Sequence, residues 1–201
     1  MDLFNGRFRL SDGKPAAGSE RVETVDELFT RFGRSTFDGG LYRVHDAVSS
    51  LKFSALVTEA FPEMSVSLTC FGFDWLGRQF AVDQRERDKP DAEILMFIPG
   101  TGDALDIPVP FSTFHHEGLN EFAEGALAIS YYAEWRTISQ SDLFFDQCAG
   151  YRIPLFLGGA DEVGNLETTD MDVYWSLMSQ LRQSTQVLEP GTGIKDVELN
   201  D

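Results

Sequence analysis

The spacing of apolar residues in the first third of the chain predicts two helices. Thr24 and Glu27 have the T-x-x-E spacing of a helix capping box, and an apolar stripe follows them, so we predict a helix over about 25–32. Between 53 and 61, five apolar residues recur at i, i+3, i+4, i+7 and i+8. This pattern is typical of one helix face, and Pro62 ends it.

The middle of the chain changes from a helical to an extended pattern. Four short runs rich in β-branched and aromatic residues occupy 64–73, 78–83, 93–99 and 104–109, with turn-forming or charged stretches between them. Sequential strands with tight connections favour an antiparallel meander. We therefore predict an α+β fold, with a central, mostly antiparallel sheet of about four or more strands flanked by helices.

The last third of the chain returns to a helical period. A long apolar stripe predicts a helix over about 117–135, and a second helix is predicted over 142–149. The run YRIPLFL, 151–157, has the composition of a buried strand. Asp170 then precedes another apolar stripe and is expected to cap a final helix.

Three regions follow from the loss of periodicity at both ends. We predict a loosely attached, flexible arm over 1–20, a single compact body over 21–184, and a mobile acidic tail over 185–201. Within the body, no stretch has the composition of a linker. We therefore expect one continuous body, or two parts that share an extensive interface.

The charge of the chain restricts its partners. Lys and Arg total 16 against 33 Asp and Glu, which gives a net charge of −17 spread over the whole length. Such a surface repels nucleic acid and anionic membranes and attracts basic partners, although solubility alone would also explain it. The first residues do not form a signal peptide, so we expect a cytoplasmic protein. Cys70 and Cys148 lie among apolar neighbours and are expected to be buried thiols.

A glycine-containing acidic loop, PLFLGGADEVGNLE at 154–167, is the first candidate site. Asp161, Glu162 and Glu167 would repel a phosphate, and the spacing of oxygen ligands does not fit a calcium loop of the EF-hand type. An irregular cation site remains an alternative. Gly158 and Gly159 are expected to fix the fold where the chain leaves the sheet. We predict no catalytic residue, no metal site and no cofactor.

The DWLGR motif lies between two predicted strands. Gly77 permits a turn conformation there, and Trp75 is expected to anchor the hairpin on the core. Asp74 and Arg78 are placed to pair across the turn.

The final predicted helix carries two adjacent aromatic residues, Tyr174 and Trp175. Adjacent helical positions point in different directions, so we expect that at most one of them faces the core fully. The other becomes a candidate for contact with a partner.

Four segments together resemble a known family. FDGGLYRVH, FGFDWLGRQFAVD, LMFIPGTGDALDIPVPFSTFHHE and CAGYRIPLFLGGADEVGNLETTDMDVYWSLMSQL occur in an order similar to that of the Tdi family, the immunity proteins paired with type VI secretion DNase effectors. The similarity spans about 25–181. It implies a GAD-like part over 21–108 and a Tdi-type C-terminal part over 109–184.

The resemblance implies a protein that is not an enzyme and that binds and neutralises a cognate DNase toxin. The net charge agrees with this partner, because a nuclease presents a basic cleft to DNA. The residues that we expect to contact the toxin are Asp161, Glu162, Glu167, Asp170, Asp172, Tyr174 and Asp74. Those expected to fix the fold are Trp75, Gly77, Arg78, Gly158, Gly159 and Trp175.

Two other functions are kept as alternatives. One is an acidic DNA mimic or regulatory adaptor that binds a DNA-binding protein of the host. The other is a metal-dependent hydrolase that uses Asp161, Glu162, Glu167 and Asp170.

Overall fold

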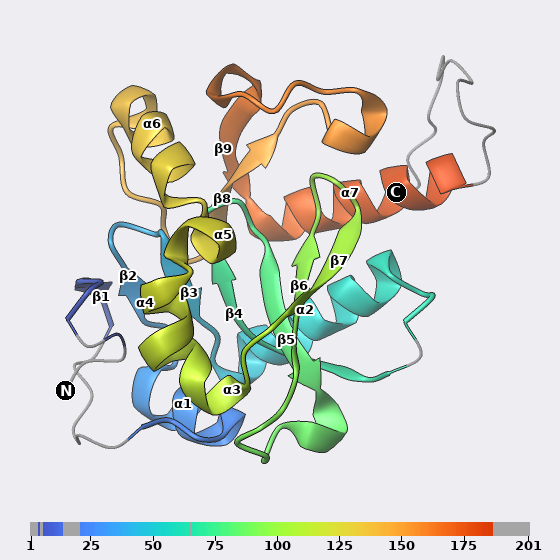
Figure 1. The fold of residues 1–201 in the computed structure, drawn as a ribbon. Coiled ribbons are helices and arrows are strands. Elements are labelled where there is room, and N and C mark those ends of the chain that lie inside the picture. The colour runs from blue at the N-terminus through green and yellow to red at the C-terminus, as the bar shows by residue number, and fades with distance from the viewer. Residues whose placement is uncertain (1–3, 5, 14–20, 65, 187–201) are drawn as a thin grey trace.

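The computed structural model places a seven-stranded antiparallel sheet at the centre of the molecule (Figure 1). It describes residues 4, 6–13, 21–64 and 66–186. The sheet runs in chain order, so it is a meander, as predicted, and the α+β class is confirmed. Its strands are β1 (Leu10–Asp12), β2 (Thr36–Phe37), β3 (Tyr42–Val44), β4 (Leu68–Asp74), β5 (Gln79–Asp83), β6 (Ile94–Ile98) and β7 (Asp103–Ile107).

The described residues of the N-terminal arm pack against the body. Phe4 and Phe8 are buried, and β1 forms the edge of the sheet beside β2. The loose attachment predicted for these residues is therefore wrong. The rest of the predicted arm, 1–3, 5 and 14–20, and the tail from 187 lie outside the described residues.

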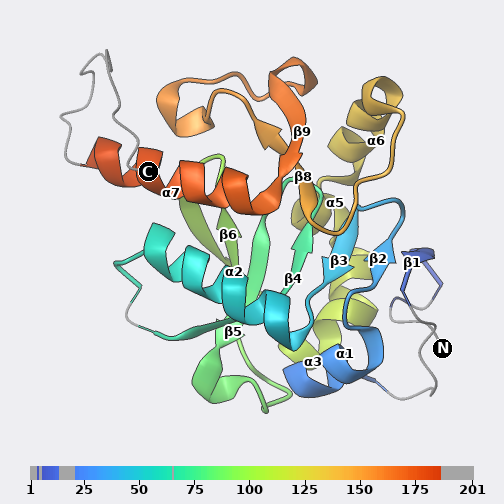
Figure 2. The ribbon, with the colours of Figure 1, turned by 180° about the vertical axis from the view of Figure 1, so that it is seen from behind.

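Helices cover both faces of the sheet (Figures 1 and 2). On one face, α2 (Ala47–Ala60) and α7 (Met171–Gln186) run side by side, and their buried residues form one hydrophobic cluster with that face. The other cluster includes α1 (Val25–Phe32) and the helices that follow β7. Each face of the central strands is thus buried, which explains why β4 is buried along its whole length.

The helix starts predicted at Thr24 and Asp170 are confirmed. The Thr24 side chain accepts a hydrogen bond from the backbone N–H of Glu27, and the Glu27 carboxylate accepts from the backbone N–H of Glu23. Asp170 caps α7, because its carboxylate accepts from the backbone N–H groups of Asp172 and Val173 at 2.9 and 3.2 Å. These caps satisfy donors that a helix start leaves unpaired.

The predicted helix over 117–135 is interrupted. The structure has α3 (Phe111–Thr113), a π-helical turn (Phe114–Gly118), α4 (Leu119–Glu121), α5 (Ala123–Leu127) and α6 (Ile129–Ser139).

Tertiary hydrogen bonds explain the main break, at Ala128, which has a left-handed φ of 49°. The carbonyl oxygens of Ala126 and Leu127 accept from the side chains of Arg78 and Trp75 at 3.0 and 2.9 Å. In a continuous helix those oxygens would accept from backbone N–H groups four residues later. The side-chain donors therefore take the place of the helical bonds.

The segment after α6 also differs from the prediction. Residues 142–146 form a loop, and β8 (Gln147–Tyr151) pairs with β9 (Leu166–Asp170), so the helix predicted over 142–149 is wrong. The buried Arg43 guanidinium donates to the carbonyl oxygens of Phe144 and Gln147, which holds this stretch extended. The strand predicted over 151–157 is wrong as well, because Leu155–Leu157 is a half-buried 3-10 turn after Pro154.

Candidate protein-binding surface

Most of the predicted acidic contacts lie on the surface between the 3-10 turn at Leu155–Leu157 and the start of α7. Asp161, Glu162, Glu167 and Asp170 are exposed, and Asp172 is half-buried. They do not form one uniform group. Asp161 accepts a hydrogen bond from the Tyr151 hydroxyl at 2.5 Å, Asp170 caps α7, and Asp172 forms an ion pair with Lys52.

Asp74 and Tyr174 are not on the surface, which corrects their prediction as toxin contacts. Asp74 is completely buried, and its carboxylate pairs with the Arg78 guanidinium at 2.5 Å, as expected across the turn. Tyr174 is 4% exposed, and its hydroxyl accepts from the backbone N–H of Tyr151. The neighbouring Trp175 is buried too, so both aromatic residues of this pair face the core. A ring on either side of α7 can be buried because the helix lies between α2 and the β8–β9 hairpin.

The DWLGR turn joins the sheet to the two helical layers. Gly77 has a φ of +75°, and a Cβ there would approach the Cys148 Sγ to 3.2 Å. Trp75 and Trp175 are both buried, and the Trp175 indole donates to the Gly77 carbonyl oxygen at 2.8 Å. These contacts support the fold role expected for the motif.

The two glycines of the acidic loop have different roles. Gly158 has a φ of +87°, and nothing lies within 4 Å of a Cβ built there. At Gly159, a Cβ would lie 1.9 Å from the Ile153 carbonyl oxygen. Gly158 therefore supplies a left-handed turn, whereas Gly159 permits a close approach of two backbone segments.

A hollow that the sequence did not indicate lies where the N-terminal ends of α2 and α7 meet. Its volume is about 400 Å³. Side chains from α2, α7, the loop before β8 and Arg34 line it. We call it the α2/α7 hollow, defined by Arg34, Asp46, Val48, Ser49, Lys52, Phe53, Phe145, Asp146, Met171 and Asp172.

Val48, which lines the α2/α7 hollow, is exposed to solvent, and so are three large apolar residues that are adjacent in sequence to lining residues. Val48 and Leu51 on α2 are 79% and 76% exposed, Phe144 is 73% exposed, and Val173 on α7 is 61% exposed. Leu51, Phe144 and Val173 are not lining residues themselves, but each is adjacent in sequence to one: Lys52, Phe145 or Asp172. The sequence gives one signal for these exposed residues: Val48 and Leu51 lie outside the apolar stripe of the helix that contains Phe53.

The charged groups of the α2/α7 hollow are partly paired with each other. Lys52 forms an ion pair with Asp172, and the Arg34 guanidinium stacks over the Phe145 ring at 4.2 Å. Partial burial raises the pKa of Asp46, but hydrogen bonds from Ser49 and the charge of Arg34 lower it overall, so Asp46 is anionic. Asp146 is exposed and is in none of the ion pairs of the described residues.

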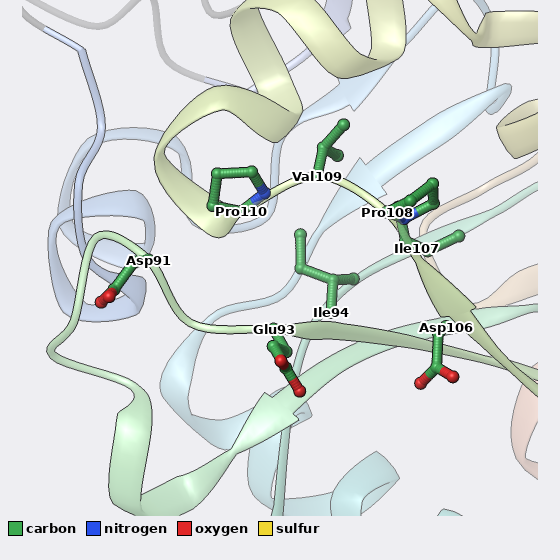
Figure 3. A pocket seen from close by; sticks show the side chains of 8 residues that line it. All are labelled: Asp91, Glu93, Ile94, Asp106, Ile107, Pro108, Val109 and Pro110. Carbon is green, nitrogen blue, oxygen red and sulfur yellow. The ribbon is translucent and has the colours of Figure 1, made fainter.

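A second hollow of about 470 Å³ is acidic (Figure 3). Asp91, Glu93 and Asp106 line it, and Figure 3 shows the carboxylates of Glu93 and Asp106 pointing toward the same side. Ile94, Ile107 and Val109 supply apolar walls. All three acidic residues are exposed, and no Lys or Arg is among the lining residues.

The described residues include no candidate metal centre. They contain no group of three or more His, Cys, Asp or Glu side chains that is placed to hold a metal ion, so Asp161, Glu162, Glu167 and Asp170 do not converge as the hydrolase alternative requires. Both cysteines are buried and free, as expected, and burial raises the pKa of the Cys70 thiol to about 12. A thiol of that pKa is not a nucleophile at neutral pH.

Residues 116–182 match the family described as T6SS immunity protein Tdi1, C-terminal. This match confirms the resemblance to the Tdi family of type VI secretion immunity proteins over these residues. The GAD-like part predicted over 21–108 lies outside the matched residues and stays a prediction.

The solved structures include a protein of similar fold. The crystal structure of Atu4351 from Agrobacterium tumefaciens has a TM-score of 0.53 and 15% sequence identity to this chain, and the alignment covers 72% of this chain and 69% of that one. At this identity the likeness concerns the fold alone. A search of the curated proteins found no match. No helix among the described residues is long and apolar enough to cross a membrane.

Proposed function

We propose that this immunity protein binds and neutralises a DNase toxin of a type VI secretion system. The observation that carries the proposal is the match of residues 116–182 to the Tdi1 C-terminal family. Neutralisation would occur by protein–protein contact, without catalysis by this chain.

Electrostatics supports a nuclease as the partner. A DNase needs a positively charged cleft to hold a polyanion, and a protein with a net charge of −17 is complementary to such a cleft. Complementary charge increases the association rate and makes it sensitive to salt. Two modes of inhibition fit this chemistry. The acidic surface could cover the DNA cleft, or the immunity protein could insert between elements of the nuclease and distort its active site.

We place part of the contact on the exposed carboxylates of the segment from 161 to 172. Glu162 and Glu167 are the strongest candidates, because both are exposed and neither forms an ion pair within the described residues. Asp161, Asp170 and Asp172 lie on the same segment but already bond to other groups of the chain. These three carboxylates would add negative charge to the contact surface, but their existing bonds restrict their movement toward a partner.

Co-expression with the nuclease encoded beside the gene tests the proposal. We expect the tagged chain to retain the nuclease domain on a column and to abolish its cleavage of plasmid DNA at equimolar ratio. An unrelated acidic protein of similar net charge is the control, and it should leave cleavage intact. If the chain neither retains the nuclease nor protects cells that express it, the proposed function is wrong.

A further inference from the structure

We propose that the α2/α7 hollow is the site where the toxin's nuclease domain is anchored. The occupant would be a surface loop or helix of that domain that carries a large apolar side chain beside a lysine or arginine. This inference rests on the proposed function and specifies which surface of the immunity protein makes the main contact.

The first argument is the exposure of apolar side chains around the α2/α7 hollow. Val48, Leu51, Phe144 and Val173 are each more than 60% exposed, and they come from α2, the loop before β8 and α7. Val48 lines the hollow, and the other three residues are adjacent in sequence to its lining residues Lys52, Phe145 and Asp172. Single exposed apolar residues are ordinary on a protein surface, but several close to one concavity are typical of a contact site for another protein. Anchoring residues of interfaces are typically apolar side chains that fill such hollows.

The second argument is that the fold does not use these side chains. The inward face of α2 buries Phe53, Val57 and Ala60 against the sheet and α7, whereas Val48 and Leu51 point away from that core. Removing the two exposed side chains should therefore leave the stability of α2 nearly unchanged. Within the part of the chain that the structure describes, their apolar character therefore adds little to packing.

The third argument is that the walls of the α2/α7 hollow are held in place. The Lys52–Asp172 ion pair joins α2 to α7, and the stack of Arg34 on Phe145 joins the chain after α1 to the loop before β8. Asp46 caps α2 through a hydrogen bond of 2.8 Å from the Ser49 N–H. A site that is already formed loses less entropy when a partner binds.

Charge complementarity indicates a basic occupant. Two cations, Arg34 and Lys52, and three carboxylates line the α2/α7 hollow. The carboxylates are those of Asp46, Asp146 and Asp172, so the lining has a net negative charge, and Asp146 is exposed and forms no ion pair within the described residues. A lysine or arginine beside the inserted apolar group would meet these carboxylates.

The acidic hollow of Figure 3 is the competing surface. It carries three carboxylates, but the Ile94 side chain in its wall is only 1% exposed. It would attract a basic partner without offering a group of protruding apolar anchors. It therefore serves as the matched control for charge.

The test replaces the anchors of the α2/α7 hollow and compares them with exposed aliphatic residues elsewhere. The probe is the nuclease domain recovered in the co-expression experiment, and its dissociation constant is measured by titration calorimetry. We expect Val48→Ser with Leu51→Ser to weaken binding at least ten-fold. The control pair, Leu105→Ser with Ile138→Ser, lies on β7 and α6 and should change the dissociation constant less than two-fold.

A second pair of variants tests the charge argument. We expect Asp146→Asn to weaken binding about three-fold at low salt and less at high salt, whereas Glu93→Gln with Asp106→Asn should have no effect. The inference is overturned if Val48→Ser with Leu51→Ser binds like the parent, or if the control pair weakens binding equally. If the parent chain binds no nuclease, the proposed function fails first and the inference falls with it.

Discussion

At the scale of single residues, the buried His45 makes the stability of the protein depend on pH. Its ring contacts the Ser49 hydroxyl and the Gln79 amide oxygen at 3.0 and 2.8 Å. Burial lowers the pKa of His45 from 6.5 to about 4, although the hydrogen bond to Gln79 opposes this. Between those values the unfolded chain binds a proton at this residue and the folded chain does not. The contribution to stability is therefore complete above pH 6.5 and is lost as the pH falls to about 4.

A His45→Asn variant should lose this pH dependence. We expect the free energy of unfolding of the parent chain to fall between pH 7 and pH 5 by about 2 kcal/mol more than that of the variant. Urea unfolding at both pH values measures the two differences, and the carboxylates common to both proteins cancel. Equal differences in the two proteins would show that His45 is not buried in its neutral form.

The two glycines of the acidic loop should respond unequally to alanine. Gly158→Ala places a Cβ in open space but in a left-handed conformation, which costs about 1 kcal/mol. Gly159→Ala drives a Cβ into the Ile153 carbonyl oxygen, so the backbone must shift at a cost of about 2–3 kcal/mol. Denaturant midpoints of both variants give the order, and a larger loss at Gly158 would contradict the close approach seen at Gly159.

At the scale of elements, the attachment of α7 depends on Trp175. The indole of Trp175 donates to the Gly77 carbonyl oxygen, and its ring is fully buried beside the sheet. Trp175→Phe leaves that carbonyl without its partner and creates a void, so we expect a loss of about 2–4 kcal/mol and faster hydrogen exchange along α7. Val173→Ala, at an exposed position of the same helix, is the control and should change neither. Unchanged exchange in Trp175→Phe would show that other contacts hold α7.

The elements that local signals determine could be predicted from the sequence. Thr24 and Asp170 start their helices through bonds to backbone groups two or three residues away, and the strands of the meander pair with their neighbours in the chain. The breaks could not be predicted in this way. Ala128 and the loop before β8 are held by Trp75, Arg78 and Arg43, which lie about 50 or 100 residues away in the sequence.

In the candidate site, too, features set by local sequence could be predicted and features set by distant residues could not. The exposure of Glu162 and Glu167 could be inferred from an acidic loop between buried segments, whereas the burial of Asp74 depends on a pairing partner and on helices packed over both sides. The α2/α7 hollow exists because two helices more than 100 residues apart meet at their first turns. The sequence pattern of either helix alone does not predict this contact between them. The position of Val48 in the hollow, one turn before Leu51, is therefore seen only in the structure.

At the scale of the whole molecule, the position of the negative charge matters as well as its sum. Replacing Asp161, Glu162 and Glu167 with lysine changes the charge by two units at each of three exposed positions. We expect the triple variant to fold normally and to associate with the nuclease domain about ten-fold more slowly at low salt, because the local field that steers the partner is reversed. Stopped-flow association at several salt concentrations measures the effect, which should shrink as salt screens the charges.

A variant with the same total charge separates position from sum. Asp88, Glu121 and Glu134 are exposed and lie on other parts of the surface, so their replacement by lysine changes the net charge equally. If the loop from 161 to 167 contacts the nuclease, this second variant should slow association much less than the first. Equal slowing by both variants would show that only the total charge steers the partner, and an unchanged rate in the first would remove the loop from the interface.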